Sequence, residues 1–373
     1  MQLSNEDSLR LNVLLNQDLQ AIRIDESKMI VYGLSEKGEA KIILNPNCQD
    51  DRYLKTVKEL ISSKVLGSPG GYPVFLRRWT RMGQARDESL GRLLQLGEAE
   101  AVIAVVHASG LTDELARRAW WAMPNAENAR CMLQKDAIVQ GKMGVELAEF
   151  LIEFLPFEEE ARDIIETVRL VLQGQLISEQ QRQNLWQRGQ RKNAFLVGFL
   201  CTAADNLPLE KNSHPALADY QKKLAPLIRQ DNIVACQFQR LLEAPGQAFL
   251  ATVNTVLKKP ANQDVVIALL NAIHDYFSPL KLLPEKEDDI LVIMETAAKL
   301  MDEKSDASLL AVLNALPESG NMLHALLVLS VVGEQIVNPV FSRSNAIGTL
   351  MRKKLEPVFD PLFRQIKLLT ATV

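Results

Sequence analysis

An arginine cluster near residue 80 is the part of the sequence best suited to binding phosphate. Four arginines alternate with aromatic residues there, and no acid occurs until Asp87; they are Arg77, Arg78, Arg81 and Arg86, interleaved with Tyr72, Phe75 and Trp79. Cations neutralise phosphates and aromatic rings stack on bases, as on RNA-binding surfaces. The same spacing also puts an apolar stripe on one helix face and the charges on the solvated face. We therefore favour a hinge with a partner-docking patch over nucleic-acid binding, which stays the alternative.

The glycines ahead of this cluster do not form a nucleotide-binding loop. Gly67, Gly70 and Gly71 are not followed by the lysine and hydroxyl residue that a phosphate-binding loop needs. The dinucleotide fingerprint GxGxxG is missing from the sequence. We therefore predict no nucleotide cofactor and no other cofactor.

Two adjacent tryptophans, Trp120 and Trp121, form a second candidate contact. Neighbouring side chains point about 100° apart on a helix, so at most one of the two is fully in the core. Core packing explains the pair, whereas an exposed indole would anchor a partner. The candidate contact residues are thus Arg77, Arg78, Arg81, Trp120 and Trp121.

The sequence offers no recognisable catalytic or metal-binding group. Its histidines and cysteines are scattered; they are His107, His214, His274, His324, Cys48, Cys131, Cys201 and Cys236. No HExxH, CxxC or GxSxG motif occurs, and a lone histidine in an apolar helix is usually a packing residue. The acidic runs at 158–160 and 285–289 are expected to cap helices, and Arg352, Lys353 and Lys354 to complement a helix end. We predict no metal site and no enzyme.

Composition and charge point to an ordinary folded protein. The 373 residues are 47% hydrophobic, and 42 basic against 46 acidic residues give a net charge of -4. This charge creates no global attraction to nucleic acid or an anionic membrane, so any such binding must be local. The amino-terminal residues do not look like an export signal, and no apolar run reaches the ~20 residues of a membrane span. We expect a cytoplasmic protein with no membrane partner.

The first 67 residues predict a small α+β unit. Helical spacing over residues 7–17 and 51–66 encloses three short alternating segments, joined by turn residues. These segments predict a three-stranded meander. The unit is too small to bury a large core, so we expect it to pack against the next part of the chain. A linking segment is expected at 68–86.

Residues 87–208 predict a helical-repeat domain. The tripeptide Glu-Leu-Ala at 114–116 recurs at 146–148, Pro124 recurs as Pro156, and Ala-Arg at 129–130 recurs at 161–162, each with an offset of 32. A weaker third copy is expected from 178 to 208. Such periods are typical of stacked helical hairpins in a HEAT-like α-solenoid. The alternative makes residues 101–108, AVIAVVHA, a parallel strand, because β-branched residues favour strands.

A polar linker at 204–215 divides the chain again, and residues 209–373 are assigned to a C-terminal all-helical domain. Short helices separated by prolines are expected throughout it. The last of them, 346–369, is expected to break near Pro357 and Pro361. The whole chain is thus predicted to be mainly α, with a small N-terminal α+β unit.

Several long segments of the sequence are distinctive; they include IRIDESKMIVYGLSEKGEAK, VLGSPGGYPVFLRRWTRMGQARDESLGRLLQLGEAEAV, GLTDELARRAWWAMPNAENAR, GQRKNAFLVGFL and KKPANQDVV. These segments resemble the DsrS family of soluble proteins, which are encoded with the dissimilatory sulfite reductase system of sulfur-oxidising bacteria. The resemblance covers residues 5–200 and 258–266. It implies a cytoplasmic accessory or regulatory role in sulfur oxidation, with no catalytic residue to transfer.

The residues and the resemblance support three functional hypotheses. The first is a non-catalytic protein that acts through protein-protein contacts on a helical-repeat scaffold, with a component of the sulfur-oxidation machinery as partner. The second is a regulator that binds RNA or a ribonucleoprotein through the patch from Arg77 to Arg86. The third is an enzyme with an unrecognised pocket.

Overall fold

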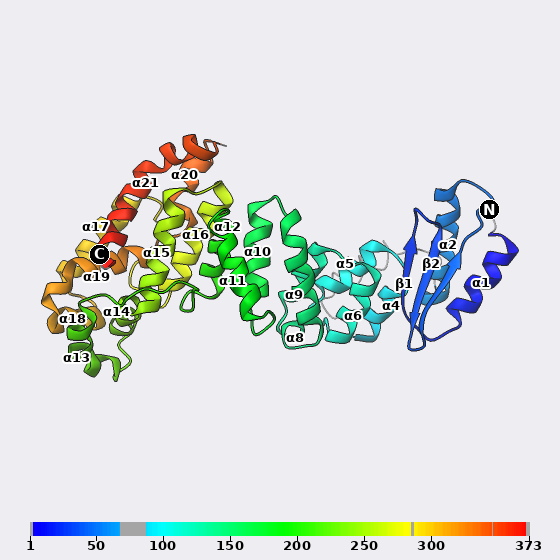
Figure 1. Ribbon diagram of the computed structural model, residues 1–373, viewed down its shortest axis with the longest axis horizontal. Helices are drawn as coiled ribbons and strands as arrows, with labels where there is room; N and C mark the ends of the chain where they lie inside the picture. Colours follow the sequence, from blue (N-terminus) through cyan, green and yellow to red (C-terminus); the bar gives the residue numbers. More distant parts are fainter. Residues whose placement is uncertain (1–2, 68–86, 285–286, 345, 371–373) are drawn as a thin grey trace. The chain divides into compact units, whose positions relative to one another are not determined.

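A computed structural model describes residues 3–67, 87–284, 287–344 and 346–370 (Figure 1). The chain is mainly α-helical with one small antiparallel sheet near the N-terminus, as predicted. It divides into two compact units, Met1–Pro156 and Phe157–Val373. The finer division at residues 67, 86 and 208 stays a prediction, and the predicted linking segment lies outside the described residues.

The N-terminal α+β fold has the predicted meander. Strands β1 (Leu19–Asp25), β2 (Ile30–Ser35) and β3 (Gly38–Ile43) pair antiparallel in the order β1-β2-β3. The turn into β3 uses Gly38 at φ 114°, a conformation that side chains disfavour. Helices α1 (Asn5–Leu15) and α2 (Asp50–Leu66) share one apolar cluster with the sheet, and Leu11, Ile22, Val31, Tyr53 and Ile61 belong to it.

A buried carboxylate joins these elements. Asp7 of α1 is fully buried and accepts hydrogen bonds from the Tyr53 hydroxyl at 2.5 Å and the Asn45 amide at 2.8 Å. Burial raises the pKa of Tyr53, and its bond to Asp7 raises it further. A buried carboxyl group needs hydrogen-bond partners, so this contact fixes α1 against α2 and the end of the sheet.

From residue 87 onward, the first unit is helical. Its helices are α4 (Asp87–Leu94), α5 (Ala99–His107), α6 (Asp113–Ala122), α7 (Ala126–Leu133), α8 (Asp136–Val139) and α9 (Met143–Phe154), followed by the 3-10 turn η1 (Leu155–Phe157). The helical interpretation of AVIAVVHA is confirmed, and the parallel strand is wrong. Val102, Val105 and Val106 are buried while Ile103 is 40% exposed, which is a helical stripe and not an alternation.

Burial recurs with the predicted offset of 32 residues. The matched buried pairs are Leu115 and Leu147, Ala116 and Ala148, Ala119 and Leu151, Ala129 and Ala161, Met132 and Ile164, and Leu133 and Ile165. Within the first unit, the Asp113 carboxylate at the start of α6 accepts bonds from the amides of Lys142 and Met143 at the start of α9. This carboxylate satisfies amides that α9 leaves unpaired, and it fixes the register of the two helices.

The described residues of the second unit form helices and no strand. The helices are α10 (Ala161–Val171), α11 (Glu179–Arg188), α12 (Ala194–Thr202), α13 (Leu217–Ile228), α14 (Ile233–Leu242), α15 (Ala244–Lys258), α16 (Gln263–Phe277), α17 (Ile290–Glu303), α18 (Ala307–Ala315), α19 (Gly320–Ser330), α20 (Asn338–Phe341) and α21 (Gly348–Leu369), with 3-10 turns η2 (Pro317–Ser319) and η3 (Glu334–Ile336). Helices α12 and α19 are buried on nearly all sides. Asp289 caps α17 by accepting a bond from the Leu291 amide, as expected of that acidic run.

Helix α21 corrects two expectations. It runs unbroken through Pro357 and Pro361, which lie four residues apart and away from the core. Leu355, Phe359 and Leu362 are buried on both sides of the prolines, so packing holds the two halves in one helix. Residues 352–354 lie near the start of this helix and not near an end that cations complement.

Candidate functional site

The predicted arginine contacts cannot be placed. Arg77, Arg78 and Arg81 lie outside the described residues. The two tryptophans are described, and they point to different surroundings.

Trp121 is engaged inside the first unit. Its indole Nε1 donates to Glu39 Oε2 of β3 at 2.9 Å, and the Arg23 guanidinium of β1 lies 5.0 Å from the ring centroid. Arg23 also donates to the Trp121 carbonyl oxygen at 3.3 Å. Trp121 therefore joins α6 to the sheet and is not a free anchor.

The junction around Trp121 is a network of polar and ring contacts, which we call the Arg23 cluster (Arg23, Tyr32, Glu39 and Trp121). The Arg23 guanidinium also lies 4.6 Å from the Tyr32 ring centroid and 3.6 Å from Glu39 Oε2. Nearby, Arg117 donates to Gln20 Oε1 at 2.7 Å. The α+β fold thus leans on the helices next to it in the chain, as expected.

Trp120 faces another surface of α6. Its half-buried ring meets Phe150 of α9 edge-on, with centroids 4.8 Å apart, and Phe150 stacks on Phe154 at 5.9 Å. Phe154 is 37% exposed. Trp120, Phe150 and Phe154 form a row that we call the aromatic ladder.

Acidic residues border the aromatic ladder. Glu149 and Glu153 each precede a ladder phenylalanine by one residue and are exposed, and Glu146 lies one turn before Phe150 and is exposed too. Val145 adds an apolar side chain that is 44% exposed. The surface of α6 and α9 is therefore aromatic at its centre and negatively charged beside it.

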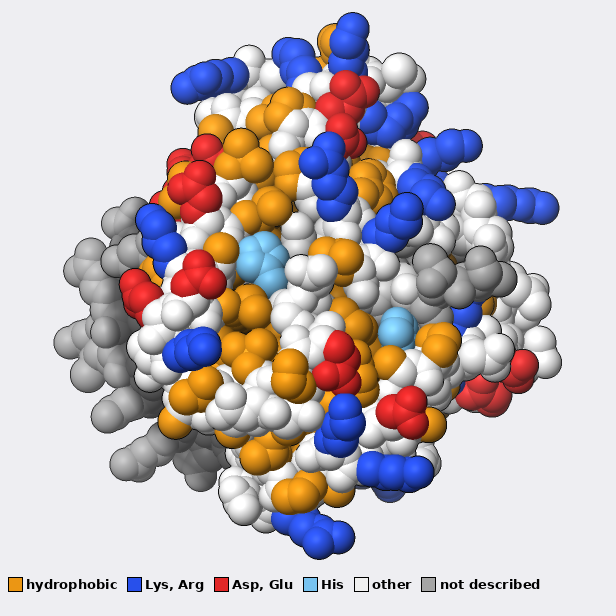
Figure 2. Space-filling model, turned by 90° about the vertical axis from the view of Figure 1, so that its left-hand side faces the viewer, with side chains coloured by type: hydrophobic (Ala, Val, Ile, Leu, Met, Phe, Trp, Pro, Cys, Tyr) orange, Lys and Arg blue, Asp and Glu red, His pale blue; other side chains and the backbone are white. Residues whose placement is uncertain are grey.

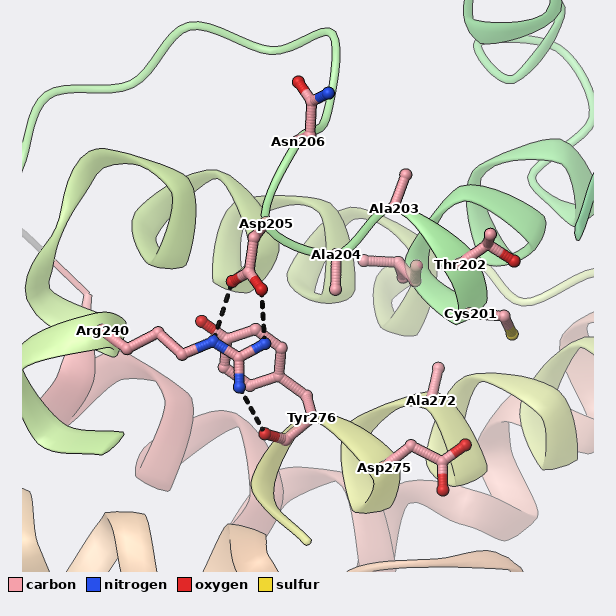
Figure 3. A pocket seen from close by; sticks show the side chains of 11 residues that line it. Cys201, Thr202, Ala203, Ala204, Asp205, Asn206, Arg240, Ala272, Asp275 and Tyr276 are labelled. Carbon is pink, nitrogen blue, oxygen red and sulfur yellow. Dashed lines mark hydrogen bonds and ion pairs between the residues drawn. The ribbon is translucent and has the colours of Figure 1, made fainter. Parts of the chain in front are cut away.

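A separate hollow lies in the second unit (Figure 3). It has a volume of about 310 Å³ and is lined by residues of α12, the loop after it, α14 and α16, among them Cys201, Asp205, Arg240, Asp275 and Tyr276. Sequence reasoning did not single out these residues. Their partners are far apart along the chain, so no local pattern marks them.

Arg240 is the centre of this hollow, and we call Asp205, Arg240 and Tyr276 the Arg240 cluster. Arg240 Nε and Nη2 donate to the two Asp205 carboxylate oxygens at 2.9 and 2.6 Å, and Arg240 Nη1 donates to the Tyr276 carbonyl oxygen at 3.2 Å. The guanidinium lies 4.0 Å from the centroid of the Tyr276 ring. Two parallel hydrogen bonds from one guanidinium to one carboxylate, which we call the fork, are stronger than hydrogen bonds between neutral groups.

Tyr276 lies between two flat groups. Phe249 stacks on it, with centroids 3.9 Å apart, and Tyr276 is 3% exposed. Its hydroxyl has no hydrogen-bond partner among the described residues. Burial raises the pKa of Tyr276, although the nearby Arg240 charge lowers it. The phenol is therefore neutral at neutral pH.

The Cys201 thiol and the Thr202 hydroxyl also line the hollow. Burial raises the pKa of Cys201 to about 11, so this thiol is protonated and a poor nucleophile at neutral pH. Thr202 donates to the Arg169 carbonyl oxygen, and the Asp205 carboxylate is held by Arg240. The geometry fits a clamp that holds the loop after α12 against α14 and α16.

Three of the four histidines make polar contacts, whereas the buried Nδ1 of His274 has no hydrogen-bond partner among the described residues. His324 Nε2 bonds the Met294 carbonyl oxygen at 3.0 Å, His214 Nδ1 accepts from the Ala216 amide, and His107 Nδ1 lies 3.4 Å from Cys131 Sγ. No group of three or more metal-binding side chains occurs in the part of the chain that the structure describes.

Comparison with known protein families, curated proteins and solved structures gives no match to this chain. Within the described ranges, no helix combines the length and the apolarity that crossing a membrane requires.

Proposed function

We propose that the chain is a non-catalytic accessory or regulatory protein that works by binding another protein on its helical scaffold. The observation that carries this proposal is the aromatic ladder of α6 and α9. Tryptophan and other aromatic side chains supply a large share of the binding energy at protein interfaces.

The ladder suits such a contact because it is already ordered. Trp120 and Phe150 hold each other edge-on, so little side-chain freedom is lost when a partner covers them. Glu149 and Glu153 beside the ladder favour a partner whose rim carries lysine or arginine. The partner we propose is thus an apolar surface bordered by positive charge.

The resemblance to the DsrS family suggests in which process this contact acts. It supports a role in the cytoplasm of a sulfur-oxidising bacterium, with a component of the sulfur-oxidation machinery as partner. The Arg77 to Arg86 patch remains the basis of the alternative, an RNA-binding regulator.

Affinity purification from sulfur-grown cells tests the proposal. We expect the wild-type chain to retain one or more companions that Trp120→Ala loses. Because Trp120→Ala also removes a packing contact, Glu149→Lys with Glu153→Lys provides a second variant at exposed positions, and it should lose the same companions.

Trp121→Phe is the matched control. It keeps an aromatic ring at a position outside the ladder and removes the Nε1 bond to Glu39, so the companions should stay. Equal retention of companions by all variants would contradict the proposal. Salt-dependent RNA binding that disappears on substituting Arg77, Arg78 and Arg81 would favour the alternative.

A further inference from the structure

A positively charged segment surrounds the start of α21. No aspartate or glutamate occurs between Glu334 and Glu356, whereas four cations do: Arg343, Arg352, Lys353 and Lys354. Arg343, Lys353 and Lys354 are exposed, and Arg352 is partly exposed. The local charge is thus opposite in sign to the net charge of the chain.

Helix stability does not account for these cations. Three of them lie in the second turn of α21, and the first turn contains no acidic residue. The N-terminal end of a helix carries the positive end of its dipole, so it favours acids and disfavours lysine and arginine.

Ion pairing does not account for them either. Among the described residues, Lys354 Nζ donates to the Ser344 hydroxyl at 2.7 Å, and Arg352 donates to the Thr349 hydroxyl at 3.0 Å. Neither hydroxyl carries charge, and none of the four cations pairs with a described carboxylate. The four charges are therefore available to an outside anion.

Two aliphatic side chains project beside these cations. Ile347 is 72% exposed and Leu350 is 58% exposed. Leu350 lies three and four residues before Lys353 and Lys354, so the three share one face of α21. Figure 2 shows Lys and Arg side chains gathered toward the top of the face that it draws, with hydrophobic side chains between them.

We propose that this basic-apolar patch (Arg343, Ile347, Leu350, Arg352, Lys353 and Lys354) docks on the surface of an anionic lipid bilayer. Proteins that bind a membrane surface often do so with lysine and arginine placed around protruding aliphatic side chains. RNA recognition would favour exposed aromatic rings for stacking, and the two most exposed apolar residues here are aliphatic. The expectation of no membrane partner rested on the net charge of the chain and on the lack of a membrane span, and neither describes the charge of a local patch.

Vesicle co-sedimentation of the full chain tests the patch. We expect binding to phosphatidylcholine vesicles that contain phosphatidylglycerol, little binding to phosphatidylcholine alone, and release as salt is raised. Each lysine near an anionic surface contributes about fivefold to partitioning, so Lys353→Gln with Lys354→Gln should lower it roughly 25-fold. Leu350→Asn should lower it without changing its salt dependence.

The matched control is Lys222→Gln with Lys281→Gln, which makes the same change of net charge at exposed positions of the same unit. It should bind vesicles like the wild type, and circular dichroism should show that all variants are folded. Equal binding to neutral vesicles, or an equal loss in the control, would overturn the proposal. So would binding of single-stranded RNA in place of vesicles, or full competition by free glycerol phosphate.

Discussion

The two units use the same three kinds of group to join distant segments. In the first unit, the Arg23 cluster combines a guanidinium, aromatic rings and Glu39 at the junction of sheet and helices. In the second unit, the Arg240 cluster combines a guanidinium, the Tyr276 ring and Asp205. The exposed fractions of the ion pairs are similar, at 34% and 42% for Arg23 and Glu39 and 35% and 53% for Arg240 and Asp205.

Solvent therefore screens the two ion pairs to a similar degree, and the clusters differ in their contact geometry. Arg23 meets Glu39 by one contact of 3.6 Å, whereas Arg240 grips both oxygens of Asp205 at 2.6 and 2.9 Å. Arg240 also covers a ring that is almost fully buried, while Trp121 is only half-buried. We therefore expect the fork and the buried ring, more than exposure, to decide how much such a cluster contributes to stability.

Arg240→Ala should give the largest effect. It removes the fork to Asp205, the bond to the Tyr276 carbonyl and the cover of the Tyr276 ring, so we expect the second unit to lose about 2–3 kcal/mol of unfolding free energy. Arg240→Lys keeps the charge but not the fork, and should lose about half as much. Because a chain of two units need not unfold in one step, native-state hydrogen exchange of amides in α14 and α16 is the suitable measurement.

Asp275→Asn is the control for Arg240. It changes an exposed carboxylate that lines the same hollow but does not contact the fork, so its effect should stay within about 0.5 kcal/mol. If Arg240→Lys matched the wild type, charge alone would explain the cluster, and the importance given to the fork would be wrong.

Local signals allowed much of the helical fold to be predicted. Helices α14 and α16 are short helices of the kind expected in this region, and each begins at an asparagine cap; Asn232 accepts from the Ala235 amide and Asn262 from the Val265 amide. The α5 helix could be predicted for a similar reason, since its apolar spacing is helical. Caps and periodicity depend on neighbours in sequence, which are visible before folding.

The Arg240 cluster could not be predicted in this way. Asp205 falls in a segment that composition marks as a polar linker, and its partner lies 35 residues away. The unbroken α21 is a similar case, since contacts with other helices outweigh the local effect of Pro357 and Pro361. These two features depend on contacts between segments that are distant in the sequence. The local spacing of residues does not reveal such contacts.

Arg23→Ala should have a smaller effect than Arg240→Ala. It removes one long ion pair, the bond to the Trp121 carbonyl and two ring contacts, and we expect the first unit to lose about 1 kcal/mol. Hydrogen exchange of amides in β1 and α6 would report it. A loss as large as that of Arg240→Ala would show that fork geometry does not distinguish the two clusters.

Glu114→Gln tests an ion pair that has no aromatic ring beside it, and we expect it to have the smallest effect on stability. Arg117, and then Arg118, bond the Glu114 carboxylate and lower its pKa from 4.5 to about 2, with no aromatic ring in the arrangement. A carboxylate with a lowered pKa stabilises the folded state above its ordinary pKa, and that contribution disappears as pH falls from about 4.5 towards 2. Because Glu114 is 48% exposed, we expect no more than about 0.5 kcal/mol at pH 7. The difference between wild type and variant, measured by hydrogen exchange of α6 amides, should be constant from pH 7 to 5 and vanish by pH 2; a difference that grew towards low pH would have the wrong sign for this ion pair.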